Sequence, residues 1–355
     1  MNIEVRPTTT PRPRPTGALG FGIHFTDHVF RMDYKEGAGW QHARIEAYSG
    51  ATLDPAASVL HYAQVVFEGL KAFRGPDGGL GLFRVDRHAR RFAKSCEKLC
   101  IPAIPESDVV EAIVRVVEQD ASWVPDASSG GALYVRPFVY ATEAFLGVRP
   151  AKEFTFCVIL SPVGAYYERG FAPVKIWVER EAVRAVKGGV GDAKTAANYA
   201  ASLHAAFAAK KRGYDQVLWT DAITHEKIEE VGTMNLFVAF DDEIVTPSLD
   251  GTILDGVTRN SVLTLLRARG LKVVERSITL DEVKQGQKSG KLREIFGTGT
   301  AAVISPVGTL GFDDGDLTIG DGQPGKLALS LFDELTKIQR GEAPDPHGWV
   351  RRLEG

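Results

Sequence analysis

The chain has 355 residues, of which 44% are hydrophobic and 25% charged, and its formal net charge at pH 7 is -3. This length and apolar content predict a protein with a large core that is long enough for two domains. Because acidic and basic residues nearly cancel and no apolar run is long enough for a bilayer, the sequence argues against nucleic-acid-binding and membrane-spanning proteins.

Residues 1–20 contain prolines and arginines but no apolar segment, so we expect an extended N-terminal arm rather than a secretory signal. The three cysteines, Cys96, Cys100 and Cys157, have neither a disulfide-framework nor a metal-binding spacing. An odd, unpatterned set of this kind favours a reducing cytoplasm.

Residues 21–163 mix short β-like runs with amphipathic helical runs, which predicts a smaller α/β domain. In the first predicted helix, Arg91 flanks the apolar face at about 100° per residue, whereas Arg90 points nearly opposite. Arg91 is therefore the better candidate to reach a ligand in the interior. The expected strands are GLGLF (79–83), ALYVRPFVY (132–140) and EFTFCVIL (153–160), and the expected helices are HARRFAKSCEKL (88–99) and DVVEAIVRVVEQ (108–119).

A segment rich in glycine and tyrosine, residues 164–174, has neither the strand nor the helix period, so we expect an interdomain linker there. Residues 175–355 then predict a larger α/β domain. Its expected strands are VKIWVER (174–180), QVLWTD (216–221) and MNLFVAF (234–240), and its expected helices are residues 196–213, 256–270 and 324–340.

The motif GDAKTAANYAAS places Lys194 among small residues directly before one of these helices. Tyr199, Leu203 and Phe207 recur every four residues, so we expect them to share one inward-facing apolar surface. A buried phenol needs a hydrogen-bond partner, which Lys194 could supply. A desolvated lysine has a lowered pKa and can form a Schiff base, although most lysines in such a position are solvated.

A carboxylate and two glycine-containing segments add a possible cofactor site. Glu230 stands between a charged turn and a predicted strand, so it is either a surface residue or a buried one with a partner such as the pyridinium nitrogen of pyridoxal phosphate. Val257 and Thr258 begin a helix, whose free amides favour an anion. The GTGT loop at 297–300 offers further amides and hydroxyls.

That loop also spells G-x-G-x-x-A, which raises the alternative of a dinucleotide-dependent oxidoreductase. The fingerprint requires a helix after the loop, and the sequence AAVISPVGTL indicates a strand instead. The sequence therefore disfavours this alternative.

Six ordered blocks across most of residues 20–310 together resemble the branched-chain amino acid aminotransferases, which have the D-amino-acid-transaminase-like, type IV pyridoxal-phosphate fold. The blocks are VVFEGLKAF, LYVRPFVYATEAFLGV, GGVGDAKTAANYAAS, EEVGTMNLFV, LDGVTR and GTGTAAVISPV. The resemblance implies a mixed α/β, two-domain enzyme with pyridoxal 5'-phosphate as cofactor. It would transfer the amino group of leucine, isoleucine or valine to 2-oxoglutarate.

Three alternatives to this activity stay open. A D-amino-acid transaminase and an aminodeoxychorismate lyase share the scaffold, and a non-enzymatic binder could retain the cofactor pocket. Arg136, Tyr134 and the long VGAYYERG segment favour the branched-chain enzyme over its sister activities, and the presence of Lys194 and Glu230 argues against a non-enzymatic binder.

The resemblance also implies the roles of single residues. Lys194 would form the Schiff base, Tyr199 would bond the ring oxygen of the cofactor, and Glu230 would pair with its pyridinium nitrogen. The other implied cofactor contacts are Arg91, Thr233, Val257, Thr258 and Thr300, and the implied substrate pocket is formed by Phe67, Tyr62, Tyr134, Arg136, Tyr166 and Ala301. In the family the loop carrying Leu146 and Val148 closes over the partner's site, which implies a homodimer.

Two further patterns carry no function. Some members of the family have a redox-active C-x-x-C after the phosphate loop, but residues 302–305 read AVIS here, so no thiol switch is expected. His24 and His28 have a ligand-like spacing but no third convergent ligand, so we predict no metal site.

Overall fold

The computed structural model describes residues 1–164 and 171–354. By internal contacts the chain divides into two compact units. The first unit comprises Met1–Tyr166, Ala193–Ala196 and Lys337–Gly355, and the second comprises Tyr167–Asp192 and Ala197–Thr336. The segments 193–196 and 337–355 thus belong to the first unit, although they lie within the sequence span expected for the larger domain.

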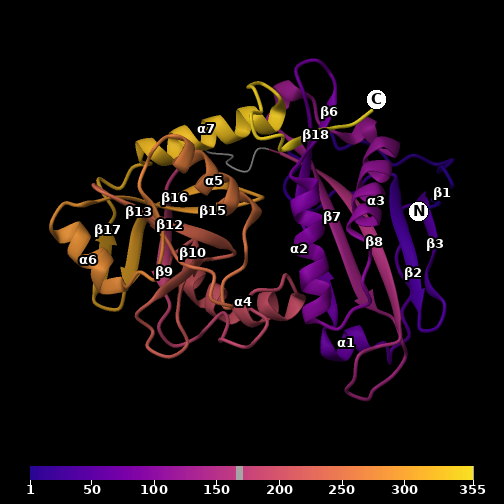
Figure 1. Cartoon of the computed structure of the whole chain (residues 1–355), viewed down its shortest axis with the longest axis horizontal. Coiled ribbons are helices and arrows are strands. Elements are labelled where there is room, and N and C mark those ends of the chain that lie inside the picture. The colour runs from indigo at the N-terminus through magenta and orange to yellow at the C-terminus, as the bar shows by residue number, and fades with distance from the viewer. Residues whose placement is uncertain (165–170, 355) are drawn as a thin grey trace. The chain divides into compact units, whose positions relative to one another are not determined.

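Among the described residues, the first unit contains a nine-stranded sheet in the order β1-β3-β2-β8-β7-β5-β6-β18, with β4 paired to β7 beside this path (Figure 1). Its strands are β1 (Glu4–Val5), β2 (His28–Lys35), β3 (Gly39–Ala47), β4 (Val65–Phe67), β5 (Leu70–Arg74), β6 (Leu80–Phe83), β7 (Ala132–Ala141), β8 (Glu153–Val163) and β18 (Val350–Arg352). Its helices are α1 (Ser58–Tyr62), α2 (Val85–Lys98) and α3 (Glu106–Gln119), with short 3-10 turns at Ala121–Trp123 and Ala127–Ser129.

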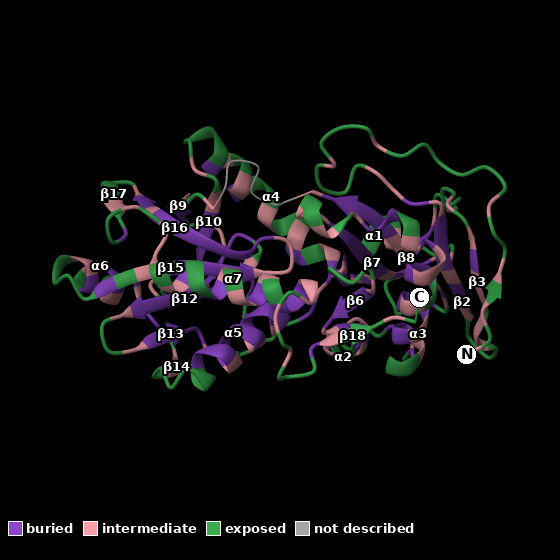
Figure 2. Ribbon diagram, turned by 90° about the horizontal axis from the view of Figure 1, so that it is seen from above, coloured by how far each residue is buried: buried purple, intermediate pink, exposed green. Residues whose placement is uncertain are grey.

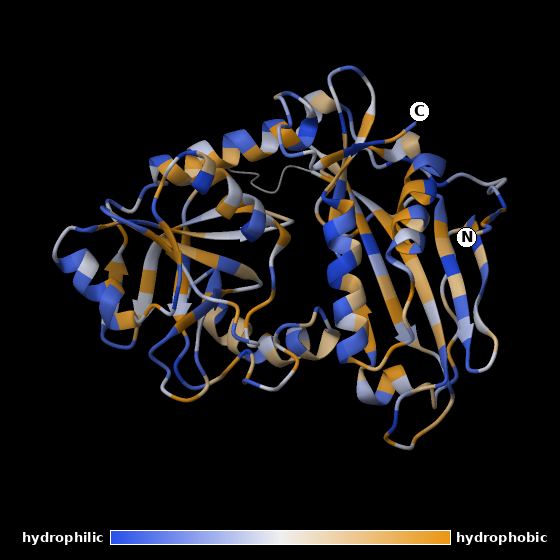
Figure 3. Cartoon of the chain, viewed as in Figure 1, coloured by the Kyte–Doolittle hydropathy of each residue, from blue (hydrophilic) through white to orange (hydrophobic). Residues whose placement is uncertain are grey.

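The core of the first unit lies between this sheet and the helices α2 and α3. The two helices contact each other, and α3 contacts β2 and β8. Hydrophobic residues follow one face of each helix, while β7 and β8 are buried along most of their length (Figures 2 and 3). Burial of this helical stripe against the sheet fixes which α2 side chains point into the unit.

The second unit also contains a nine-stranded sheet among its described residues, in the order β11-β10-β9-β16-β15-β12-β13-β14, with β17 paired to β16. Because β11 pairs with both β10 and β12, the six strands from β11 to β12 close into a ring. The strands are β9 (Val174–Val178), β10 (Gln216–Thr220), β11 (Ile228–Val231), β12 (Met234–Phe240), β13 (Ile244–Thr246), β14 (Val273–Glu275), β15 (Leu292–Gly299), β16 (Val303–Phe312) and β17 (Gly315–Thr318). The helices are α4 (Ala196–Lys211), α5 (Val257–Ala268), α6 (Leu280–Lys288) and α7 (Lys326–Arg340), of which the first residue of α4 and the last four of α7 are counted with the first unit.

Every helix and strand expected from the sequence is present, within a few residues of its predicted bounds. Strand β16 follows the GTGT loop, so the helix that a dinucleotide fingerprint needs is replaced by a strand, as predicted. None of the described helices combines the length and apolar character that a membrane crossing requires.

The predicted inward face of α4 is wrong. Leu203 is 67% exposed and Phe207 is 60% exposed, while Tyr199 is half-buried. The helix instead buries small residues, including Ala205 and Ala209. Alanine side chains allow a helix to approach its neighbours closely, so in this alanine-rich segment the large residues are not the reliable markers of the buried side.

Candidate active site

Lys194 is held in the first unit by backbone bonds on both sides. Its carbonyl accepts from the Phe67 N-H at 3.0 Å, and its own N-H donates to Ser95 Oγ at 3.0 Å. The next residue, Thr195, donates its hydroxyl to the Val65 carbonyl at 2.8 Å. The segment is therefore tied to strand β4 and helix α2, which fixes the point from which the lysine side chain extends.

Aromatic and cationic side chains surround that lysine. Lys194 Nζ lies 4.9 Å from the centre of the Phe67 ring, and the Arg136 guanidinium lies 4.7 Å from the same ring. Arg136 Nη2 donates to the Tyr134 hydroxyl at 3.0 Å, while Arg136 Nε is buried without a hydrogen-bond partner among the described residues. Gly69 leaves room for that phenol, since a Cβ there would lie 1.9 Å from Tyr134 Oη. The structure thus brings four predicted site residues together.

The remaining aromatic residues predicted for the pocket are placed differently. Tyr62 is 42% exposed at the end of α1, where its hydroxyl donates to the Leu146 carbonyl. Tyr166 lies outside the described residues. Phe21 was not predicted for this pocket from the sequence, yet its ring meets the Tyr134 ring edge-on at 4.9 Å. An aromatic residue between two glycines was the only signal for it.

Arg91 is buried in the first unit and Arg90 is exposed, as the helical period predicts. The Arg91 guanidinium donates to Glu68 from Nε at 2.7 Å and from Nη2 at 2.9 Å. Arg90 instead lies 3.7 Å from Glu106 at the surface. Of these two adjacent arginines, only Arg91 therefore places its guanidinium in the interior of the first unit.

Glu230 belongs to the second unit and is only 3% exposed, so the surface alternative is wrong. Its carboxylate accepts from the Leu254 N-H at 2.9 Å and from Asn235 Nδ2 at 3.3 Å, and it forms an ion pair with Arg184 Nε at 3.1 Å. A buried carboxylate with a cation and two N-H donors is stable in its ionised form.

Arg184, the cationic partner of Glu230, was not predicted from the sequence. Its guanidinium is anchored by the Gly191 carbonyl at 3.1 Å and by the Thr252 carbonyl. A buried carboxylate requires a cationic partner, so the sequence indicated that Glu230 would have one, but it did not indicate which arginine this would be.

Register places the GTGT loop on the same face of the sheet as Glu230. In the ladder, Glu230 stands opposite Asn235 on β12, and Asn235 stands opposite Thr298 on β15. Directly opposed residues of antiparallel strands share a face. The Thr298 hydroxyl is buried and has no hydrogen-bond partner within the part of the chain that the structure describes.

The N-terminus of α5 completes the set in the second unit. Gly256 is its N-cap and has no side chain to accept the first amides, and Val257 and Thr258 are both buried. A Cβ at Gly256 would lie 1.8 Å from Asn235 Oδ1, so only glycine fits there. The uncapped N-terminus provides a positive end suited to an anion. Of the other predicted contacts, Thr300 and Ala301 are half-buried after β15, and Thr233 is exposed in the β11–β12 turn.

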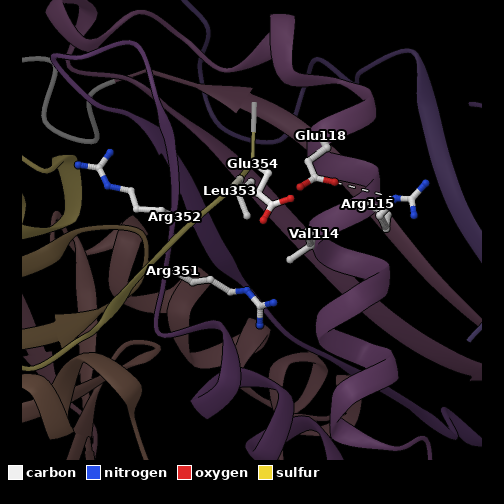
Figure 4. A pocket seen from close by; sticks show the side chains of 7 residues that line it. All are labelled: Val114, Arg115, Glu118, Arg351, Arg352, Leu353 and Glu354. Carbon is white, nitrogen blue, oxygen red and sulfur yellow. Dashed lines mark ion pairs between the residues drawn. The ribbon is translucent and has the colours of Figure 1, made fainter.

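A cavity of about 520 Å³ opens elsewhere in the first unit, between α3 and the C-terminal strand (Figure 4). It contains none of the predicted cofactor or substrate residues, and its charges are mixed. The lining residues are Val114, Arg115, Glu118, Arg351, Arg352, Leu353 and Glu354.

The chain is similar to known proteins over most of its length. Residues 65–310 match the family described as Amino-transferase class IV. The chain is 51% identical to branched-chain-amino-acid aminotransferase 2 of Bacillus subtilis over 99% of this chain and 97% of that protein. It is 47% identical to the branched-chain-amino-acid aminotransferase of Mycobacterium tuberculosis, over 94% and 92% respectively.

A solved structure gives the same result. The branched-chain amino acid aminotransferase of T.th., complexed with N-(5'-phosphopyridoxyl)-L-glutamate, superposes with a TM-score of 0.72 at 26% identity. The alignment covers 90% of this chain and 97% of that chain.

Proposed function

The chain belongs to the class IV amino-transferase family, and from that membership we propose that it transfers the amino group of L-leucine, L-isoleucine or L-valine to 2-oxoglutarate. The products are the branched 2-oxo acid and L-glutamate. Pyridoxal 5'-phosphate is the cofactor. The observation that supports the proposal most is the fixed backbone of Lys194 beside the cluster of Phe67, Tyr134 and Arg136.

The residues present fit the groups of this cofactor. Its aldehyde needs an amine, its ring nitrogen an anionic acceptor, and its phosphate a cation with backbone amides. Lys194, Glu230 and Arg91 have these properties. When bound, the cofactor supplies an electron-accepting ring that makes the proton on the substrate α-carbon acidic. The further cofactor contacts that we propose are Tyr199, Thr233, Val257, Thr258 and Thr300.

We assign the proton transfers to Lys194. Its Nζ would hold the aldehyde carbon of the bound cofactor, and as a free neutral amine it would move the proton from the substrate α-carbon to that cofactor carbon. Glu230 would hold the protonated ring nitrogen of the bound cofactor, because Arg184 and two N-H donors stabilise its ionised carboxylate.

The substrate groups match the cluster around Phe67. A guanidinium binds a carboxylate well, and Arg136 has a buried Nε without a partner among the described residues, so we propose that it binds a substrate carboxylate. Phe67 and Tyr134 provide apolar surface for a branched side chain. Tyr62, Tyr166 and Ala301 are the remaining pocket residues that we propose.

We also propose a homodimer in the cytoplasm. A set of large apolar side chains is exposed on the first unit near α1, where the Tyr62 hydroxyl donates to the Leu146 carbonyl. Leu60 is 59% exposed, Leu146 60% and Val148 87%, which a partner subunit would bury. The free thiols of all three cysteines support a reducing compartment.

The first test uses the visible absorption spectrum of the protein loaded with pyridoxal phosphate. L-leucine alone, without an oxo acid, should convert the visible cofactor band to the near-ultraviolet band of the aminated cofactor, and 2-oxoglutarate should restore it. Lys194→Ala should bind the cofactor but lose turnover. Conversion by D-alanine only would contradict the substrate assignment, and the absence of a cofactor band would contradict the proposal entirely.

A further inference from the structure

Three polar side chains form a hydrogen-bonded cluster within the core of the first unit. Glu68 is 1% exposed, His88 2% and Arg91 8%. Glu68 Oε1 accepts from Arg91 Nε at 2.7 Å, and Oε2 accepts from Arg91 Nη2 at 2.9 Å. His88 Nδ1 also lies 2.7 Å from Oε2. Each oxygen of this carboxylate is therefore bound to a specific donor.

The electrostatics keep the cluster in one charge state. Burial alone would raise the pKa of Glu68, but Arg91 and His88 beside it hold that pKa well below its usual range. Burial lowers the pKa of His88, so at neutral pH its imidazole is uncharged and donates from Nδ1 to the carboxylate. Glu68 and Arg91 thus form an ionised pair of zero net charge, with His88 as a neutral third member.

A two-point contact restricts the guanidinium more than a single bond would. Arg91 binds the carboxylate through Nε and one Nη, so rotation about its Cδ–Nε bond would break at least one of two charge-assisted bonds. The plane and direction of the guanidinium are therefore set by Glu68, which the backbone N-H of Gly69 also contacts at 3.1 Å.

The cluster is close to the attachment point of Lys194. Arg91 and Ser95 are four residues apart on α2 and therefore share one face, and Ser95 Oγ accepts from the Lys194 N-H. The charge of Lys194 also lowers the pKa of His88, after the larger effects of burial and of the neighbouring charges. Arg91 therefore lies one helical turn from the residue that anchors the Lys194 backbone.

We propose that Glu68 is the positioning residue for the cofactor phosphate, because it holds the Arg91 guanidinium in the orientation that binds this group. The inference rests on the proposed function and extends it. Glu68 itself does not contact the phosphate, since two anions in a buried site repel each other. Its effect passes through Arg91 alone.

The test compares two ligands that differ only in the phosphate. Dissociation constants for pyridoxal 5'-phosphate and for pyridoxal are measured by absorbance titration, for the wild type and for each variant. Glu68→Gln keeps the shape but removes the charge, and Glu68→Asp keeps the charge but shortens the side chain. In both variants the preference for pyridoxal phosphate over pyridoxal should fall at least tenfold, while pyridoxal itself binds as in the wild type.

The matched control is the exposed ion pair of the neighbouring arginine on α2, whose carboxylate partner lies at the start of α3. Arg90 lies 3.7 Å from Glu106, so Glu106→Gln removes a carboxylate from the neighbouring arginine without touching Arg91. It should leave the phosphate preference unchanged. Arg91→Gln should lose the same preference, and adding Glu68→Gln to it should have no further effect, since both substitutions remove one interaction.

The outcomes separate this inference from the proposed function. If both Glu68 variants bind pyridoxal phosphate and pyridoxal equally more weakly than the wild type does, the Glu68–Arg91 pair is only structural. An unchanged preference for pyridoxal phosphate over pyridoxal would likewise overturn the inference. If Glu68→Gln fails to fold, as judged by circular dichroism, Glu68→Asp decides. A wild type that binds neither ligand would instead contradict the proposed function.

Discussion

Glu229 and Glu230 are neighbours on β11 and both are buried, yet their carboxylates have different partners. Glu230 has Arg184, Asn235 and a backbone N-H, whereas Glu229 Oε1 accepts from the Thr252 hydroxyl at 2.7 Å. Glu229 Oε2 is buried without a hydrogen-bond partner among the described residues. Burial raises the pKa of Glu229 to about 7. Glu229 is therefore largely protonated at moderately acidic pH, whereas Glu230 has a cation and two N-H donors around its carboxylate.

The raised pKa of Glu229 predicts a loss of stability as pH increases. The unfolded chain ionises this group near its ordinary value of 4.5, whereas the folded chain keeps the proton until about pH 7. The unfolded state therefore binds fewer protons across this interval, and the free energy of unfolding falls. Glu229→Gln stays neutral, so its stability relative to the wild type should rise by roughly 1 to 2 kcal/mol between pH 5 and pH 8. Urea unfolding without added cofactor measures this, and a pH-independent difference would contradict it.

Removing Arg184 should affect the apo protein most. Arg184→Gln leaves Glu230 buried without its cation, which costs about 3 kcal/mol in the free energy of unfolding. Pyridoxal phosphate should recover part of this loss, because its protonated ring nitrogen is a new partner for Glu230. The increase in melting temperature on adding the cofactor should thus be larger in the variant than in the wild type.

Arg180 provides the control for that variant. It lies four residues earlier and pairs with Glu226 at 2.6 Å, but both side chains are about half exposed. Arg180→Gln should cost less than about 1 kcal/mol, as surface ion pairs do. An equal cofactor-dependent increase in melting temperature for Arg184→Gln and the wild type would mean that the ring nitrogen does not pair with Glu230.

At the scale of elements, the start of α5 depends on a glycine for steric reasons. The backbone of Gly256 has a φ of -66°, which alanine also adopts, but a Cβ would lie 1.8 Å from Asn235 Oδ1. Gly256→Ala should displace Asn235 from Glu230, destabilise the protein by about 1 to 3 kcal/mol and weaken binding of pyridoxal phosphate. Gly50→Ala is the control, because its added Cβ has no atom within 4 Å. Thermal melts and titration with pyridoxal phosphate measure stability and cofactor affinity in both variants. Equal stability and equal affinity of the two variants would refute the prediction.

The success of sequence reasoning differed between elements for a physical reason. Helices with a clear apolar stripe, such as α2 and α3, were predictable, and the stripe also distinguished Arg91 from Arg90. The buried face of helix α4 was predicted wrongly because alanines lie on several sides of the helix, so the large residues do not mark the buried face. The partner of Glu230 was not predictable, since Arg184 meets it only after β10, β11 and the loop at Thr252 have assembled.

At the scale of the whole molecule, the contacts between segments far apart in the chain were the ones that the sequence did not predict. The Val350–Arg352 strand pairs with Leu80–Phe83 of the first unit, and no local pattern encodes such a register. The N-terminal arm is also held by a contact that no local pattern predicts. Thr8 donates its N-H to His28 Nε2 at 3.0 Å, while His28 Nδ1 lies 2.6 Å from Asp120. A histidine first considered as a possible metal ligand thus anchors the N-terminal arm.

The proposed homodimer predicts that two inactive variants can complement each other. If the Leu146–Val148 loop closes over the partner's site, a Lys194→Ala chain still donates an intact loop, and a chain with Leu146→Asp and Val148→Asp still carries an intact lysine. After unfolding and refolding together, half of the dimers are mixed and each contains one complete site, so about a quarter of the wild-type activity should return.

The separate variants and the order of mixing control this experiment. Each variant refolded alone should remain inactive, and mixing the folded proteins without subunit exchange should restore nothing. A loop that serves only its own chain would give a different result, because no mixed dimer would then contain a complete site and activity would stay at the level of the separate variants. The recovered fraction therefore reports directly whether one site is built from two chains, which the exposure of Leu146 and Val148 in the single chain leads us to expect.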